Sequence, residues 1–187
     1  MNLLKSYFKY MDDPSGAITQ LAAERSLSRA CMGYFAATLG WVLFFNIGDG
    51  ISPVALLLKL FVVFIAELTA GYFIASLCGL FLDFKHIKSS PAELFVLIGS
   101  AGFIKGLLVA FALISAAWPG AGLGLLAPFA LLLVLGLQLG YLTRSLMRLC
   151  GVSAAQALTA WLFGFVPALV AVVLLGVFFV WGIALLF

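Results

Sequence analysis

Charged residues are scarce in this sequence: they make up 9% of its 187 residues, whereas 65% are hydrophobic. A soluble domain needs far more polar surface than this to cover itself. A membrane-spanning helix needs about 20 predominantly apolar residues. The composition therefore leaves no room for a separate soluble catalytic domain. It favours a single domain of four to six membrane-spanning helices.

The residues that catalytic and metal sites use are also few. The single histidine, His86, lies between apolar stretches beside Lys85 and Lys88. There is no HExxH, phosphate loop or dinucleotide glycine fingerprint. An intramembrane serine protease needs a base near its nucleophile, and no histidine falls inside an apolar stretch. We therefore expect that the protein is not an enzyme and has no catalytic residues.

Cysteine is rare as well, and the three residues Cys31, Cys78 and Cys150 form neither a CxxC motif nor a Cys/His cluster. The spacing therefore indicates neither a disulfide framework nor a metal site. We expect no metal ion and no cofactor. Small apolar filler is the favoured role for these thiols, with palmitoylation of a juxtamembrane cysteine as the alternative.

What the sequence does contain is a series of long apolar stretches, at Ala30–Ile47, Val54–Leu82, Ala92–Trp118, Ala121–Leu142 and Ala157–Phe187. They predict an all-α polytopic membrane protein, a bundle of five transmembrane helices. Residues 1–29 form a cytoplasmic amphipathic N-terminal segment in this interpretation, and residues 30–187 form the transmembrane domain. The length of the last stretch leaves a count of four or six spans open.

The basic residues predict the orientation. Eight of the ten fall before the first stretch, in the second loop or in the fourth, and the other two lie inside apolar stretches. By the positive-inside rule, the N-terminus is cytoplasmic and the C-terminus lies outside. The competing interpretation, a basic patch for nucleic acid, does not fit short loops between apolar spans, so we expect no nucleic-acid partner.

Local signals place several helix ends. Met1–Met11 has a short amphipathic pattern suited to a membrane surface. Asp13 and Pro14 are expected to cap a second helix that feeds into the first span. Capping boxes are predicted at Ser90–Glu93 and Ser153–Gln156, with a weaker start at Ser52. Pro167 predicts a kink in the last span.

Glycine pairs at packing distance predict close contacts between helices. Gly102 and Gly106 lie in the third span, and Gly136 and Gly140 lie in the fourth. Residues this small allow two helix backbones to approach each other closely. We favour packing inside one bundle over a dedicated dimer face.

Two charges lie near the middle of apolar stretches, Glu67 in the second and Lys105 in the third. A charge at the bilayer centre costs at least ~2.5–3.5 kcal/mol, so each needs a partner or water. The two spans are joined by a short loop, and we predict that Glu67 and Lys105 form an ion pair. The pair either fixes helix register or serves a proton, an ion or a ligand headgroup. Asn46 and Gln138 are predicted to hydrogen-bond between helices.

The pattern as a whole resembles the Ypt-interacting protein (Yip) family in its compact bacterial form. The likeness rests on Asp13-Pro14 ahead of the first span, five spans with the N-terminus inside, and the segment Leu149–Leu158 before a proline-containing last span. It implies a small protein of the bacterial cytoplasmic (inner) membrane that binds partners or lipids. Eukaryotic members are implicated in binding Rab-type GTPases, but this chain lacks their Asp-Leu-Tyr-Gly-Pro motif, so that role is not carried over.

These observations favour a non-catalytic scaffold, a lipid- or protein-interaction subunit of a membrane complex. Its expected partners are the lipid bilayer and either another protein or a second copy of the chain. The alternative is a transporter or channel subunit that uses Glu67 and Lys105. A third hypothesis is that the basic, amphipathic N-terminus senses anionic lipid or membrane curvature.

Overall fold

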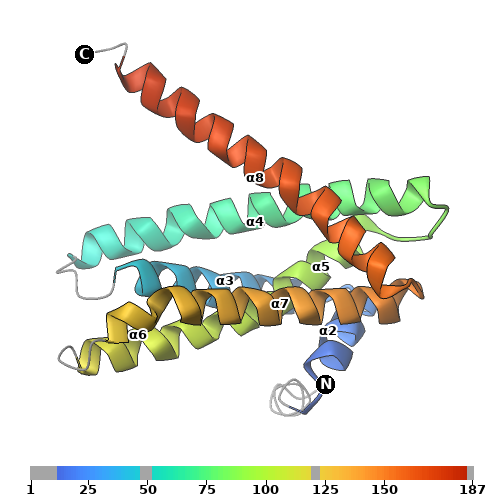
Figure 1. The fold of residues 1–187 in the computed structure, drawn as a ribbon, viewed down its shortest axis with the longest axis horizontal. Coiled ribbons are helices and arrows are strands. Elements are labelled where there is room, and N and C mark those ends of the chain that lie inside the picture. Colours follow the sequence, from blue (N-terminus) through green and yellow to red (C-terminus); the bar gives the residue numbers. More distant parts are fainter. Residues whose placement is uncertain (1–11, 47–51, 119–122, 185–187) are drawn as a thin grey trace.

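The computed structural model describes residues 12–46, 52–118 and 123–184, and all the secondary structure in them is helical. The predicted surface helix at residues 1–11 and the predicted turn at Pro119–Gly120 lie outside the described residues. The elements (Figure 1) are α2 (Pro14–Ala23), α3 (Leu27–Phe45), α4 (Pro53–Phe84), α5 (Pro91–Ala101), the 3₁₀ segment η1 (Gly102–Gly106), α6 (Leu107–Ala117), the 3₁₀ segment η3 (Leu123–Leu126), α7 (Ala127–Cys150) and α8 (Ala154–Ala184).

Five of the helical segments are long and apolar enough to cross a membrane: α3, α4, the continuous run α5–η1–α6, α7 and the first 18 residues of α8. The all-α architecture predicted from the sequence is confirmed, and by length and composition it is that of an integral membrane protein. The outward faces carry many exposed large apolar side chains, among them Leu57 and Phe61 on α4, Phe129 and Leu132 on α7, and Leu169 and Val173 on α8.

The long helices run side by side, with one exception. Helices α3, α4, α7 and the α5–η1–α6 run lie along the long axis of the molecule, while α8 crosses them obliquely and leaves the bundle toward the C-terminus (Figure 1). Helix α8 packs on α4 and α7, and α3 packs on α4, α5, η1 and α6. Pro167 lies inside α8, which continues as one helix through it.

Backbone-to-backbone contact joins α3 to the third span. A Cβ atom added to Gly33 would lie 1.9 Å from the carbonyl oxygen of Gly99, and one added to Gly40 would lie 2.3 Å from that of Lys105. Ala30 and Ala37, both fully buried, continue the same stripe of small residues on α3. The helices therefore meet at a distance that only small residues permit.

The predicted glycine contacts are only partly present. A Cβ atom on Gly102 would lie 2.6 Å from the carbonyl oxygen of Gly33, so Gly102 does lie in a tight interface. Added Cβ atoms on Gly106, Gly136 and Gly140 would meet no atom within 4 Å. The prediction that these three pack inside the bundle is wrong, because their faces point away from the neighbouring helices.

The predicted helix starts are mostly confirmed by hydrogen bonds. The Asp13 carboxylate accepts from the amide of Gly16 at 3.0 Å, and the Ser52 hydroxyl accepts from the amide of Ala55 at 3.3 Å. At the start of α8 the Ser153 hydroxyl and the Gln156 side chain each accept from the other residue's amide, at 3.3 and 3.0 Å. This is the reciprocal capping box that the sequence predicted.

The box predicted at Ser90 is wrong. The Ser90 side chain makes no capping hydrogen bond, and Glu93 instead accepts from the Arg25 guanidinium at 2.8 and 3.1 Å. Arg25 has a positive φ of 50°, which turns the chain sharply between α2 and α3. The competing ion pair therefore removes the glutamate from its predicted capping role.

Helix α2 is docked on the bundle and does not run on into the first span as expected. It packs on α5 and α7, with Ile18 and Ala22 fully buried. The first long helix starts at Leu27, so the domain boundary predicted after residue 29 falls inside it.

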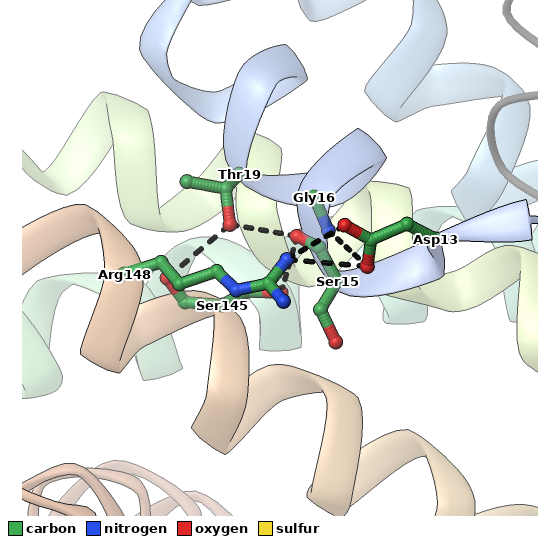
Figure 2. Close-up of polar contacts among 6 residues, drawn as sticks. All are labelled: Asp13, Ser15, Gly16, Thr19, Ser145 and Arg148. Atoms are coloured by element: carbon green, nitrogen blue, oxygen red, sulfur yellow. Dashed lines mark hydrogen bonds and ion pairs between the residues drawn. The ribbon is translucent and has the colours of Figure 1, made fainter.

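Polar contacts also tie α2 to α7, as Figure 2 shows. Arg148 lies 2.9 Å from the Asp13 carboxylate, and the Ser145 hydroxyl donates to the carbonyl of Ser15 at 3.2 Å. The Thr19 hydroxyl donates to the carbonyl of Ser15 at 2.7 Å and contacts that of Ser145 at 3.5 Å. The N-terminal helix therefore closes one end of the bundle.

Candidate functional site

A cavity of about 650 Å³ lies between α4, α7 and α8, beside η1. Most of its lining is apolar, and four side chains bring polar atoms to it: Trp41, Glu67, Lys105 and Gln138. They come from α3, α4, η1 and α7, respectively, so the fold gathers them from distant parts of the chain. Ala66 and Leu169, which are exposed, also line the cavity. The cavity therefore opens on the surface that α4 and α8 share.

Glu67 and Lys105 form the ion pair that the sequence predicts. The Lys105 ammonium lies 2.8 Å from Glu67 Oε1, with the two side chains only 11% and 18% exposed. The indole N–H of Trp41 donates to the same oxygen, and the Lys105 ammonium lies 5.0 Å from the centroid of the Trp41 ring. Lys105 is thus held by an anion and by the negative face of an aromatic ring.

The sequence reasoning missed Trp41. Its signal was available, because a buried indole N–H normally finds a hydrogen-bond acceptor. Glu67 and Trp41 were both expected inside spans, so the Glu67 carboxylate was a candidate acceptor for the indole N–H. Identifying it as the acceptor required knowing that α3 packs beside α4.

Gln138 brings a side-chain amide to the wall of the cavity. It is 8% exposed, and among the residues that the structure describes its amide has no hydrogen-bond partner. Glu67 Oε2 likewise has none in the described part of the chain. The predicted interhelical hydrogen bond of Gln138 is therefore not formed with any residue that the structure describes. A buried polar group without a partner costs free energy unless water or a ligand satisfies it.

Asn46 does make the predicted contact between helices. The Lys59 ammonium donates to Asn46 Oδ1 at 2.5 Å, joining the end of α3 to the first turns of α4. Lys59 lies near the start of α4, where a long side chain can also reach the membrane interface. The contact lies outside the residues that line the cavity.

Lys105 lies where the third span departs from regular α-helix. The segment Gly102–Gly106 is a 3₁₀ helix, with a glycine at each end. Glycine weakens an α-helix, and 3₁₀ segments inside long helices often mark strain or a hinge. On one side the backbone of the segment contacts Gly33 and Gly40 of α3, while on the other the Lys105 side chain reaches the cavity.

The arrangement supplies polar binding groups, and the charges of Glu67 and Lys105 cancel. In the described parts of the chain no cluster of three His, Cys, Asp or Glu residues has the geometry to hold a metal ion. The thiols lie apart from the cavity: Cys78 is buried and donates to the carbonyl of Ala160 at 3.0 Å, Cys150 is half-buried and Cys31 is exposed.

A second, shallower groove of about 400 Å³ runs along the outer face of α7. Its lining combines Gly136 and Gly140 with leucine side chains, Tyr141 and the exposed Arg144. The groove accounts for the open faces of the two glycines that were expected to pack inside the bundle.

No family model, no curated protein and no solved structure matches this chain. The resemblance to the Yip family stays a prediction that rests on the short sequence similarities and the five-span pattern.

Proposed function

We propose that this chain is a non-catalytic integral membrane protein that works by binding, as a lipid- or protein-interaction subunit of a membrane complex. The observation that carries the proposal is the open cavity beside the Glu67–Lys105 pair, which is lined by the Gln138 amide, a group without a hydrogen-bond partner among the described residues. A pair needed only for helix register would be expected in a packed interface, without a cavity beside it. Binding in the cavity would satisfy the free polar groups and cover apolar lining.

The proposal includes a location. The distribution of basic residues favours a cytoplasmic N-terminus, and in this orientation α2 and the Arg25–Glu93 pair would lie at the cytoplasmic end of the bundle. The likeness to compact bacterial Yip proteins favours the bacterial inner membrane. The partner in this proposal is a lipid, a protein segment or a second copy of the chain.

Site-specific photo-crosslinking in native membranes tests the proposal. A photoreactive residue at Leu169, on the exposed rim of the cavity, is compared with one at Ile65, which is exposed on α4 but does not line the cavity. We expect one adduct of defined mass at Leu169 that is absent at Ile65. If both positions give the same mixture of bulk phospholipid adducts, the cavity binds nothing and the proposal fails.

A transporter or channel subunit is the second candidate, and one observation favours it. The third span is interrupted by a 3₁₀ segment at Lys105, and many transporters place broken helices at their substrate site. This alternative predicts flux in liposomes that is lost on substitution of either Glu67 or Lys105. Liposomes that stay silent across ions and small solutes would count against it.

A further inference from the structure

We propose that the cavity selects a neutral lipid, an uncharged hydrophobic molecule whose polar part is a hydroxyl or carbonyl group. This inference rests on the proposed binding function and names the class of ligand. It follows from the charge of the site, its free hydrogen-bonding groups, its depth and its opening.

Charge comes first. Glu67 and Lys105 neutralise each other at 2.8 Å, so the charged side chains of the cavity sum to zero. An anionic or cationic ligand would add an uncompensated charge to a site of low dielectric, which is unfavourable. The pair therefore disfavours fatty-acid carboxylates and amines.

The free hydrogen-bonding groups call for a polar atom on the ligand. Gln138, at 8% exposed, offers both an acceptor and a donor that no described residue uses. The Lys105 ammonium has three donors, and within the described part of the chain only one of them is used, in the hydrogen bond to Glu67. A purely hydrocarbon chain would leave these groups unsatisfied, whereas a hydroxyl or carbonyl oxygen satisfies them.

The depth of the polar groups in the bilayer excludes glycerophospholipids as ligands that bind there through their headgroups. Glu67 and Lys105 lie near the middle of the second and third candidate spans, Pro53–Phe84 and Pro91–Ala117. In a hydrocarbon core about 30 Å thick, the headgroup of a glycerophospholipid lies roughly 15 Å from this level. A ligand that places its polar group here must itself be soluble in the bilayer interior, as neutral lipids are.

The size and opening of the cavity fit such a molecule. A volume of about 650 Å³ lies within the ordinary range of small-molecule sites. Ala66 and Leu169 at its rim are exposed, so a long apolar chain has a path from the polar cluster to the lipid that surrounds α4 and α8. The polar end would lie at Gln138 and Lys105 with the chain extending outward.

Equilibrium binding to the full chain in phosphatidylcholine nanodiscs tests this. The probes are oleyl alcohol, which carries a hydroxyl, decylubiquinone, which has carbonyl and ether oxygens but no hydroxyl, and oleate at pH 8, which carries a carboxylate. We expect at least one of the two neutral probes to bind at least tenfold more tightly than oleate. Whichever neutral probe binds more tightly identifies the preferred oxygen group. Equal or tighter binding of oleate would overturn the inference.

Variants connect the binding to the cavity. Gln138→Leu is expected to weaken binding of the neutral probe at least tenfold, and Leu139→Trp to block it by filling the cavity. The control Leu133→Met, on the outer face of α7, should bind as the unmodified chain does. Unchanged affinity in both cavity variants would place the ligand elsewhere and overturn the inference.

Failure of the inference differs from failure of the proposed function. If no probe binds but the Leu169 cross-linker captures one defined protein segment, the cavity is a protein-docking site and only the ligand class is wrong. If no probe binds and Leu169 behaves as Ile65 does, the cavity is merely hydrated and both proposals fail.

Discussion

Gly33 and Gly99 face each other so closely that a methyl group on either one would collide with the opposite helix. On Gly33 it would lie 1.9 Å from the Gly99 carbonyl oxygen, and on Gly99 it would lie 2.5 Å from the ring of Tyr34. Helices in lipid gain little from the hydrophobic effect when they associate, so close van der Waals contact carries the interaction. The α3–α5 interface is therefore sensitive to single carbon atoms.

Gly33→Ala is expected to destabilise the protein by about 1–3 kcal/mol, the usual cost of overpacking. Gly136→Ala is the matched control, because its added Cβ meets no atom within 4 Å. Alanine also favours helix over glycine, so the control should be neutral or stabilising. Thermal unfolding in detergent checks the comparison. Equal stability of the two variants would mean that α3 and α5 do not meet as described.

Removing one member of the buried ion pair should lower the free energy of unfolding far more than removing both. Lys105→Met leaves Glu67 without its cation, and Glu67→Gln leaves Lys105 without its anion, at an expected cost of about 3–5 kcal/mol each. The double variant should recover most of that loss. A double-mutant cycle of unfolding free energies measures the coupling. If the two single variants are as stable as the unmodified chain, water or lipid compensates the charge that each substitution leaves without its partner.

The docking of α2 should depend on Ile18 and hardly on Arg148. The Arg148–Asp13 pair is about half exposed on both sides, at 51% and 53%, and exposed pairs contribute little. We expect Arg148→Gln to change stability by less than about 1 kcal/mol. Ile18 is 0% exposed, and Ile18→Ala should cost about 2–4 kcal/mol.

Limited proteolysis at Arg25, in the turn after α2, provides the measurement. Cleavage by trypsin should accelerate in Ile18→Ala and stay close to the unmodified rate in Arg148→Gln. The opposite order would assign the docking of α2 to the polar contacts drawn in Figure 2.

Gln138→Leu should stabilise the empty protein. The substitution replaces an amide that lines the cavity and has no partner among the described residues, and an unpaired polar group costs up to about 1–3 kcal/mol when it is cut off from water. A higher midpoint of thermal unfolding in the absence of added lipid is the expected result. Loss of stability would show that the amide is already satisfied by bound water.

The candidate spans and the Glu67–Lys105 pair were predictable because each follows from a strong local rule. Apolar length marks a span, and a charge near its middle needs a partner. Asp13, Ser52 and Ser153 were recognisable as helix caps for the same reason, since a cap acts within its own turn of helix.

The glycine contacts, the Arg25–Glu93 pair and the cavity depend on which helices are neighbours, and the sequence of a single segment does not predict its neighbours. The Ala30–Gly40 stripe on α3 contacts the third span, yet Gly136 and Gly140, with a similar spacing, face outward. Glu93 matched a capping motif but pairs with Arg25 on a distant segment. The cavity required the crossing of α8 over α4, which periodicity does not encode.

Helix α4 has 32 residues and its neighbour α3 has 19. At 1.5 Å per residue their lengths are about 48 and 28 Å, and only the shorter one matches a hydrocarbon core of about 30 Å. A bilayer meeting both must thicken or deform on the α4 side, unless α4 tilts strongly. Hydrophobic mismatch of this kind sorts proteins among membranes of different thickness. The unequal helices would thus make this protein sensitive to the thickness of the bilayer around it.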